Sequence, residues 1–112
     1  MMKKFMLLYM APVTAEEQMA IKMDPEEGKK VMDAWTAWYD KCGSAMVDPG
    51  TPLGNGKTYA TESVGARTSQ VAGYSIVQAD NLDVVMQMLE GHPHLMMPGF
   101  SIEVLESMPI QM

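Results

Sequence analysis

Two histidines, His92 and His94, are the residues of this sequence whose type and spacing could do chemistry most directly. They are the only histidines among the 112 residues, and they flank a proline in the segment Gly91-His92-Pro93-His94-Leu95. An unperturbed imidazole titrates closest to neutral pH, so histidine is the usual proton shuttle and a frequent metal ligand. This turn is therefore the first candidate site, although the pair alone does not name a reaction.

Three roles are open for the pair. In an extended segment, side chains two residues apart point the same way, so both rings could approach one metal ion, but zinc or iron needs at least a third ligand. Alternatively, one imidazole could act as a general acid or base, oriented by Asp48 or Glu103. In the structural alternative, His92 caps the preceding helix, where the helix dipole favours a cation, and His94 packs or forms hydrogen bonds. We take His92, His94 and Asp48 as the candidate catalytic residues and expect neither a metal nor a cofactor.

Three further residues are candidates for ligand binding. Arg67 is the only arginine, and it lies in an irregular segment over residues 51–70, where a guanidinium could clamp a carboxylate. Tyr9 ends an apolar run, so its hydroxyl could lie at the mouth of a pocket or cap the core. Glu103 is the third candidate. Asp48 also has a structural interpretation, because Asp48-Pro49-Gly50 is typical of a turn.

Composition limits the classes of partner. The net charge is −6, with seven lysines and one arginine that form no basic patch, so we expect no nucleic acid and no anionic membrane as partner. The single cysteine, Cys42, excludes an intramolecular disulfide and indicates a reducing compartment. The fourteen methionines are spread along the chain, which favours packing over copper binding. The first apolar run is too short for a signal peptide, so we expect one cytoplasmic domain over residues 1–112.

Hydrophobic periodicity and capping signals predict the elements. Pro12 ends the first strand, and Thr14 with Glu17 begins a short helix. Asp24-Pro25 begins a longer helix that Gly43 ends, and Asp80 begins a helix that Gly91 ends. Gly54-Asn55-Gly56 is a hairpin-type turn. The predicted strands cover residues 5–10, 44–47, 57–60, 71–79 and 101–105.

This order predicts an α+β, ferredoxin-like βαββαβ fold, with an antiparallel sheet and both helices on one face. Val31, Trp35, Trp38 and Cys42 follow the helical spacing that would face the sheet. The other sheet face would be bare, yet the strand over residues 5–10 is apolar on both faces. A large apolar sheet face is rarely left in water, so we expect two chains to pack face to face as a homodimer, with a higher oligomer left open.

The order and spacing of several sequence blocks resemble the YCII-related (DGPF-type) family. One block is the predicted helix that begins at Asp24-Pro25 and carries Trp35 and Trp38. The other blocks are Lys4-Phe5-Met6-Leu7-Leu8-Tyr9, Gly43 through Val47-Asp48-Pro49-Gly50-Thr51-Pro52-Leu53, Gly73-Tyr74-Ser75-Ile76-Val77, Ala79-Asp80-Asn81-Leu82, Gly91-His92-Pro93-His94-Leu95 and Ile102-Glu103-Val104. The resemblance implies a dimeric α/β barrel with ferredoxin-like protomers. It also implies kinship with a dehydrochlorinase-like lyase of the wider family.

The sequence departs from that family in two places. The Asp-Gly-Pro-Phe segment has no counterpart, and residues 62–67 read Glu-Ser-Val-Gly-Ala-Arg instead. The family branch with a histidine–aspartate pair carries its histidine in the first helix, where this chain has Lys29, Lys30 and Val31. The aspartate of that pair has a counterpart in Asp48. The catalytic histidine therefore cannot be carried over.

We expect from these observations a protein that binds a small organic metabolite in a cleft beside the sheet, with His92 and His94 at its edge. One alternative is a cofactor-free lyase or isomerase in which a histidine is the acid or base and Asp48 orients it. The other is a non-catalytic structural or regulatory dimer.

Overall fold

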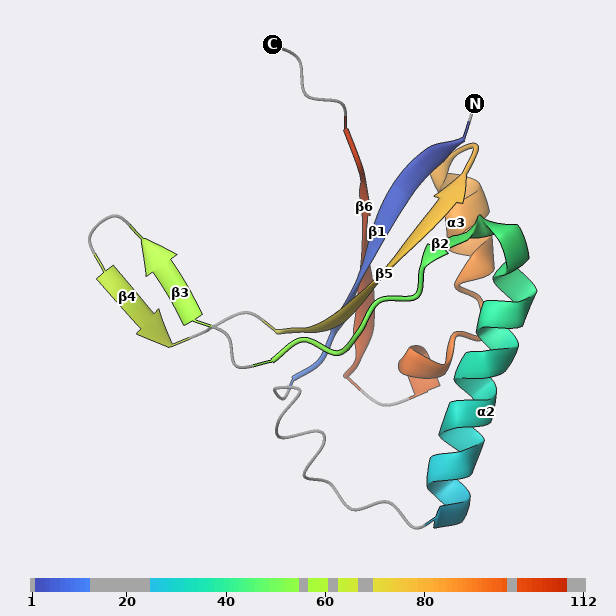
Figure 1. Cartoon of the computed structure of the whole chain (residues 1–112), viewed down its shortest axis with the longest axis horizontal. Helices are drawn as coiled ribbons and strands as arrows, with labels where there is room; N and C mark the ends of the chain where they lie inside the picture. The colour runs from blue at the N-terminus through green and yellow to red at the C-terminus, as the bar shows by residue number, and fades with distance from the viewer. Residues whose placement is uncertain are drawn as a thin grey trace.

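A computed structural model describes residues 2–12, 25–54, 57–60, 63–66, 70–96 and 99–108 (Figure 1). Two helices lie on one face of a four-stranded sheet, and a separate two-stranded hairpin extends from the sheet (Figure 1). The elements are, in chain order, β1 (Lys3–Met10), α2 (Pro25–Cys42), the 3-10 helix η1 (Gly43–Ala45), β2 (Met46–Asp48), β3 (Lys57–Ala60), β4 (Ser63–Ala66), β5 (Val71–Ala79), α3 (Leu82–Met88), the 3-10 helix η2 (Pro93–Met96) and β6 (Ser101–Glu106).

The strand order is β2-β5-β1-β6, and every pairing is antiparallel. With β3 and β4 set aside, the described elements follow the βαββαβ order, so the fold is α+β and ferredoxin-like, as predicted. The strand over residues 57–60 is also confirmed. It pairs with β4 in a sheet of its own rather than with the main sheet.

The core lies between the sheet and the helices. Because side chains of a strand alternate between faces, Phe5, Leu7 and Tyr9 of β1 all face the helices and are buried. Trp38 of α2 is buried against them, and its indole Nε1 donates a hydrogen bond to the carbonyl oxygen of Met88 at 2.9 Å. This bond links the two helices across the core, and it satisfies the polar atom that a buried tryptophan brings with it.

The alternate side chains of β1 occupy the other face of the sheet. Met6 is 39% exposed, and Leu8 and Met10 are half-buried. Their neighbour in register, Ile76 of β5, is also half-buried. A single chain therefore buries only the face of β1 that meets the helices, and it leaves the other apolar face partly exposed.

Several boundaries differ from the prediction. The second strand begins at Met46 rather than at residue 44, because the chain leaving α2 first turns through η1. Asn81, not Asp80, caps α3, since its side-chain oxygen accepts a hydrogen bond from the Val84 nitrogen at 3.0 Å. The predicted short helix and the hairpin-type turn cannot be compared, because residues 14–23 and most of the Gly54-Asn55-Gly56 turn lie outside the described residues.

The prediction that one face of the longer helix packs against the sheet is confirmed in part. Trp38 is buried and Trp35 and Cys42 are half-buried against the core, whereas Val31 is 37% exposed. Among the described helices, none has the length and apolar character required to cross a membrane.

Candidate functional site

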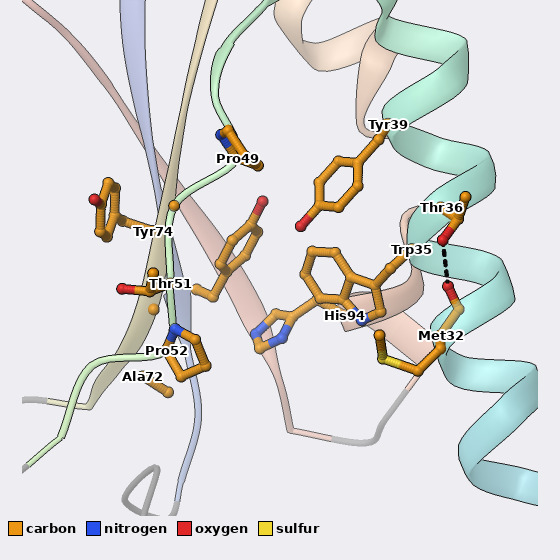
Figure 2. Close-up of a pocket in the computed structure, with 13 residues that line it drawn as sticks. Met32, Trp35, Thr36, Tyr39, Pro49, Thr51, Pro52, Ala72, Tyr74 and His94 are labelled. Carbon is orange, nitrogen blue, oxygen red and sulfur yellow. Dashed lines mark hydrogen bonds between the residues drawn. The ribbon is translucent and has the colours of Figure 1, made fainter.

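A cleft of about 430 Å³ lies between α2 and the sheet (Figure 2). One wall is α2, and the facing wall is the segment that follows β2. The end of β1, the start of β5 and the start of η2 supply the remaining residues. The described lining residues are Tyr9, Met32, Trp35, Thr36, Tyr39, Pro49, Gly50, Thr51, Pro52, Ala72, Gly73, Tyr74 and His94.

The helical wall follows from the spacing of the sequence. Met32, Trp35, Thr36 and Tyr39 are separated by three, one and three residues, which places them on one side of a helix. Figure 2 shows all four extending from α2, with the hydroxyl of Tyr39 directed toward the facing wall. This side of α2 adjoins the buried stripe, so Trp35 belongs to both the core and the cleft.

The facing wall is a tight turn that Asp48 holds. The Asp48 carboxylate accepts a hydrogen bond from the Gly50 nitrogen at 2.8 Å, which is the Asx-turn geometry expected of this residue type. Gly50 has a φ of +74°, and a Cβ atom there would lie 1.7 Å from the Tyr74 carbonyl oxygen. The turn therefore requires a glycine at this position.

A second glycine leaves room in the floor of the cleft. Gly73 is the register partner of Tyr9, and a Cβ atom at Gly73 would lie 3.3 Å from the Thr51 carbonyl oxygen and 3.5 Å from Cδ2 of Tyr9. Because no side chain fills this space, the ring of Tyr9 and the Thr51-Pro52 backbone can both reach the cleft.

Tyr9 is the first member of a buried hydrogen-bond chain. Its hydroxyl lies 2.7 Å from Ser75 Oγ, and Ser75 Oγ lies 2.7 Å from the Pro49 carbonyl oxygen. A carbonyl oxygen can only accept, so the serine proton goes to Pro49 and the tyrosine proton goes to Ser75. Burial raises the pKa of Tyr9 above its ordinary value, which keeps the hydroxyl protonated at neutral pH.

His94 lines the cleft from η2. Its Nε2 lies 2.9 Å from the Met10 carbonyl oxygen, and its ring packs against Tyr9 and Phe100 with centroid distances of 5.1 and 5.2 Å. Burial lowers the pKa of His94, although hydrogen bonds to the backbone of Met10 and Ser101 oppose the shift. The imidazole is therefore neutral at pH 7, with its proton on Nε2 and a lone pair on Nδ1.

His92 lies behind the cleft and is fully buried. Its Nδ1 accepts a hydrogen bond from the His94 main-chain nitrogen at 3.0 Å, and its ring is enclosed by Trp38, Trp35 and Tyr9 at centroid distances of 4.3, 4.8 and 5.3 Å. No described residue forms a hydrogen bond with Nε2. Burial, and to a smaller extent the neighbouring His94, lowers the pKa of His92 to about 4.

The histidine pair does not form the metal site that an extended segment would allow. The segment folds into the 3-10 helix η2 rather than an extended strand, and one nitrogen of each ring already bonds to the main chain. Within the described ranges, no group of three or more metal-ligating side chains comes together. The main-chain nitrogen of His92, not a charged ring, caps α3 by donating to the Leu89 carbonyl oxygen at 3.1 Å.

The remaining candidates are not brought together with the histidines. Asp48 is not a lining residue, and no hydrogen bond joins it to either histidine among the described residues. Glu103 is exposed and pairs in register with Leu8, which places it on the face of the sheet away from the cleft. Arg67 lies outside the described residues.

The sequence analysis missed Tyr39, Thr36 and Ser75. The first two could have been found from the helical face that they share with Trp35. Ser75 gives a different signal, because strand alternation places this hydroxyl residue on the same face as Val71 and Val77, and a buried hydroxyl needs a partner.

The similarity to known proteins is confined to the fold. No family model matches the sequence, and no curated protein matches it. A similar solved structure is 5-chloro-2-hydroxyhydroquinone dehydrochlorinase (TftG) from Burkholderia phenoliruptrix, in complex with 2,5-dihydroxybenzoquinone. It has 16% sequence identity and a TM-score of 0.52, over 93% of this chain and 90% of that chain. At this identity the comparison shows a shared ferredoxin-like fold.

Proposed function

We propose that the protein binds a small, flat, uncharged organic molecule in the cleft between α2 and the segment after β2. The observation that carries the proposal is the character of the walls: aromatic rings and prolines face one another, and none of the described lining residues carries a charge at neutral pH. A volume of about 430 Å³ is within the range of small-molecule sites. It would hold a molecule of one or two rings.

The structural neighbour supports this class of ligand. TftG was solved with a single-ring quinone bound, so its fold accommodates such a molecule. Its dehydrochlorinase activity also agrees with the lyase that the YCII resemblance of this sequence implies. We infer from both that this chain is a distant YCII-type protein.

Binding can be tested at the two tryptophans. In a proton–nitrogen correlation spectrum, each indole gives one signal, and we expect a bound aromatic molecule to shift that of Trp35 more than that of Trp38. Thr36→Phe should fill the cleft and weaken binding, whereas Ala37→Phe adds the same ring at a neighbouring, exposed position outside the lining and should not. Equal binding by both variants, or no binding of any single-ring compound by the wild type, would contradict the proposal.

A second candidate function is proton transfer by His94. The observation that favours it is the neutral imidazole in the lining, whose Nε2 proton is donated to the Met10 carbonyl oxygen. The backbone thereby takes the orienting role expected of Asp48, and Nδ1 can accept a proton. The test is exchange of the methyl protons of 4-hydroxyacetophenone in deuterium oxide, which the wild type should accelerate and His94→Gln should not. An exchange rate equal to the uncatalysed rate would contradict proton transfer by His94, and ligand binding would remain as the proposed function.

We also propose that the protein is a homodimer. The sheet face opposite the helices carries Met6, Leu8 and Ile76, together with the exposed Val47 and Leu105. Face-to-face packing of two sheets would remove this apolar surface from water. If the cleft binds no ligand, the hypothesis that remains is a non-catalytic structural dimer.

A further inference from the structure

We propose that the cleft selects ligands that donate hydrogen bonds, as phenols do, over carboxylates and carbonyl compounds that only accept them. The inference rests on the proposed function, because it names the chemical class of the same ligand. It follows from three lining groups, Tyr9, His94 and Thr36, whose protons are already donated within the protein.

The Tyr9 hydroxyl has no proton to give to a ligand. Ser75 donates to the Pro49 carbonyl oxygen, so the hydrogen bond of 2.7 Å between Tyr9 and Ser75 must use the tyrosine proton. Both bonds are short, and Ser75 is fully buried, so solvent does not compete for either. What Tyr9 can offer to the cleft is a lone pair of its oxygen.

The same holds for His94. Its Nε2 proton is donated to the Met10 carbonyl oxygen, and a neutral imidazole carries no second proton. Nδ1 therefore has no proton to donate to a ligand. The neutral form is the one present at pH 7, because burial lowers the pKa of His94.

On the helical wall, Thr36 is a third group of this kind. Its hydroxyl donates to the Met32 carbonyl oxygen at 3.0 Å, as Figure 2 shows, so its oxygen can only accept from a ligand. The main-chain proton of Gly50 on the facing wall is also in use, since it goes to the Asp48 carboxylate.

Three hydroxyls, of Tyr39, Thr51 and Tyr74, and the indole N–H of Trp35 are further donors in the lining. Figure 2 shows the Thr51 hydroxyl and the Tyr74 ring directed away from α2. The Tyr39 hydroxyl points into the cleft and can donate or accept, and burial raises its pKa, so it stays protonated. A carboxylate needs several donors or a cation, and none of the described lining residues is a cation. A phenol instead gives its proton to an acceptor and can take one from Tyr39.

The experiment compares three single-ring molecules of nearly equal size, 4-ethylphenol, acetophenone and ethylbenzene, with benzoate as an anion. Binding is followed by the Trp35 indole signal. Since a hydrogen bond contributes about 0.5–1.5 kcal/mol net, we expect 4-ethylphenol to bind roughly three- to tenfold more tightly than acetophenone. We expect acetophenone, which can only accept, as from Tyr39 or Trp35, to bind between 4-ethylphenol and ethylbenzene, and benzoate to bind most weakly.

The outcomes separate the two proposals. Equal affinities for 4-ethylphenol and acetophenone would overturn the donor preference and leave the binding site intact. Tighter binding of benzoate than of 4-ethylphenol would likewise overturn the donor preference. Absence of binding by all four molecules would overturn the proposed function itself.

Two variants test the origin of the preference. Ser75→Ala removes the acceptor of the Tyr9 proton, so the tyrosine can donate to a ligand, and the affinity ratio should shift at least about threefold toward acetophenone. Thr36→Val removes an acceptor at an exposed position and should weaken 4-ethylphenol binding alone. Ser44→Ala, an exposed serine outside the lining, is the control. Unchanged ratios in both variants would overturn the assignment of protons.

Discussion

His94 donates its main-chain N–H to Nδ1 of His92 over 3.0 Å, and this bond separates the roles of the two histidines. It turns the ring of His92 back among Trp38, Trp35 and Tyr9. It also leaves the ring of His94 in the cleft, bonded to Met10. One histidine is thus part of the core and the other is part of the site.

The buried His92 should make the fold sensitive to acid. Its pKa is about 4 in the folded protein and about 6.5 in an unfolded chain, so the unfolded state binds more protons between these values. The free energy of unfolding should therefore fall as the pH is lowered from about 6.5 to 4, by up to roughly 3 kcal/mol. Urea unfolding at a series of pH values measures this. His92→Asn keeps an acceptor for His94, and its curve should lose this part of the slope; equal slopes would contradict the assignment.

Both imidazoles should carry their proton on Nε2 at neutral pH. In His92 the main chain donates to Nδ1, and in His94 the Met10 carbonyl oxygen accepts from Nε2. Long-range proton–nitrogen spectra distinguish the two tautomers by the nitrogen shifts. A proton on Nδ1 of His94 would remove the base from the proposed proton-transfer function, although it would leave ligand binding possible.

Ser75→Ala should destabilise the protein more than Tyr9→Phe does. Without Ser75, the Tyr9 hydroxyl and the Pro49 carbonyl oxygen both lose their partner, and an unpaired buried group such as the Tyr9 hydroxyl costs about 1–3 kcal/mol. Without the tyrosine hydroxyl, Ser75 still donates to Pro49. Thermal unfolding of the two variants compares them directly, and a larger loss in Tyr9→Phe would contradict this ranking.

Asp48→Asn should leave stability and ligand binding close to those of the wild type. An asparagine retains the side-chain oxygen that accepts from Gly50, and the charge has no described partner in the cleft. Asp48→Ala removes the acceptor and should cost about 1 kcal/mol. If proton exchange into 4-hydroxyacetophenone is lost in Asp48→Asn while binding is kept, Asp48 is the orienting group after all.

The sequence predicted the framework better than the site, and the reason is physical. Periodicity reports which side of an element is apolar, so β5 and the span of α2 could be placed closely from residues alone. A binding site depends on which elements meet, and those contacts join residues distant in the sequence, such as Tyr9 and Ser75. Periodicity and capping signals describe only neighbouring residues, so they do not show which distant residues come into contact.

The histidine turn illustrates the limit. Its composition identified a residue of the cleft, yet the prediction of parallel side chains assumed an extended backbone. The chain instead forms η2, in which the neighbouring main-chain nitrogen bonds to His92. Glu103 and Asp48 failed to join the histidines for a similar reason, since strand alternation places one on the far face and a turn engages the other.

The apolar face of the sheet should control assembly. Met6 and Ile76 are register partners at the middle of that face, so a charge on either would lie in the proposed interface, where an unpaired buried charge is strongly unfavourable. We expect Ile76→Lys to be a monomer by light scattering after size exclusion, whereas the wild type is a dimer. Lys29→Glu, an exposed charge change on α2, is the control for altered net charge. A monomeric wild type would contradict the dimer. A dimeric Ile76→Lys protein would place the interface elsewhere, because a twofold face-to-face contact would bring two lysines together.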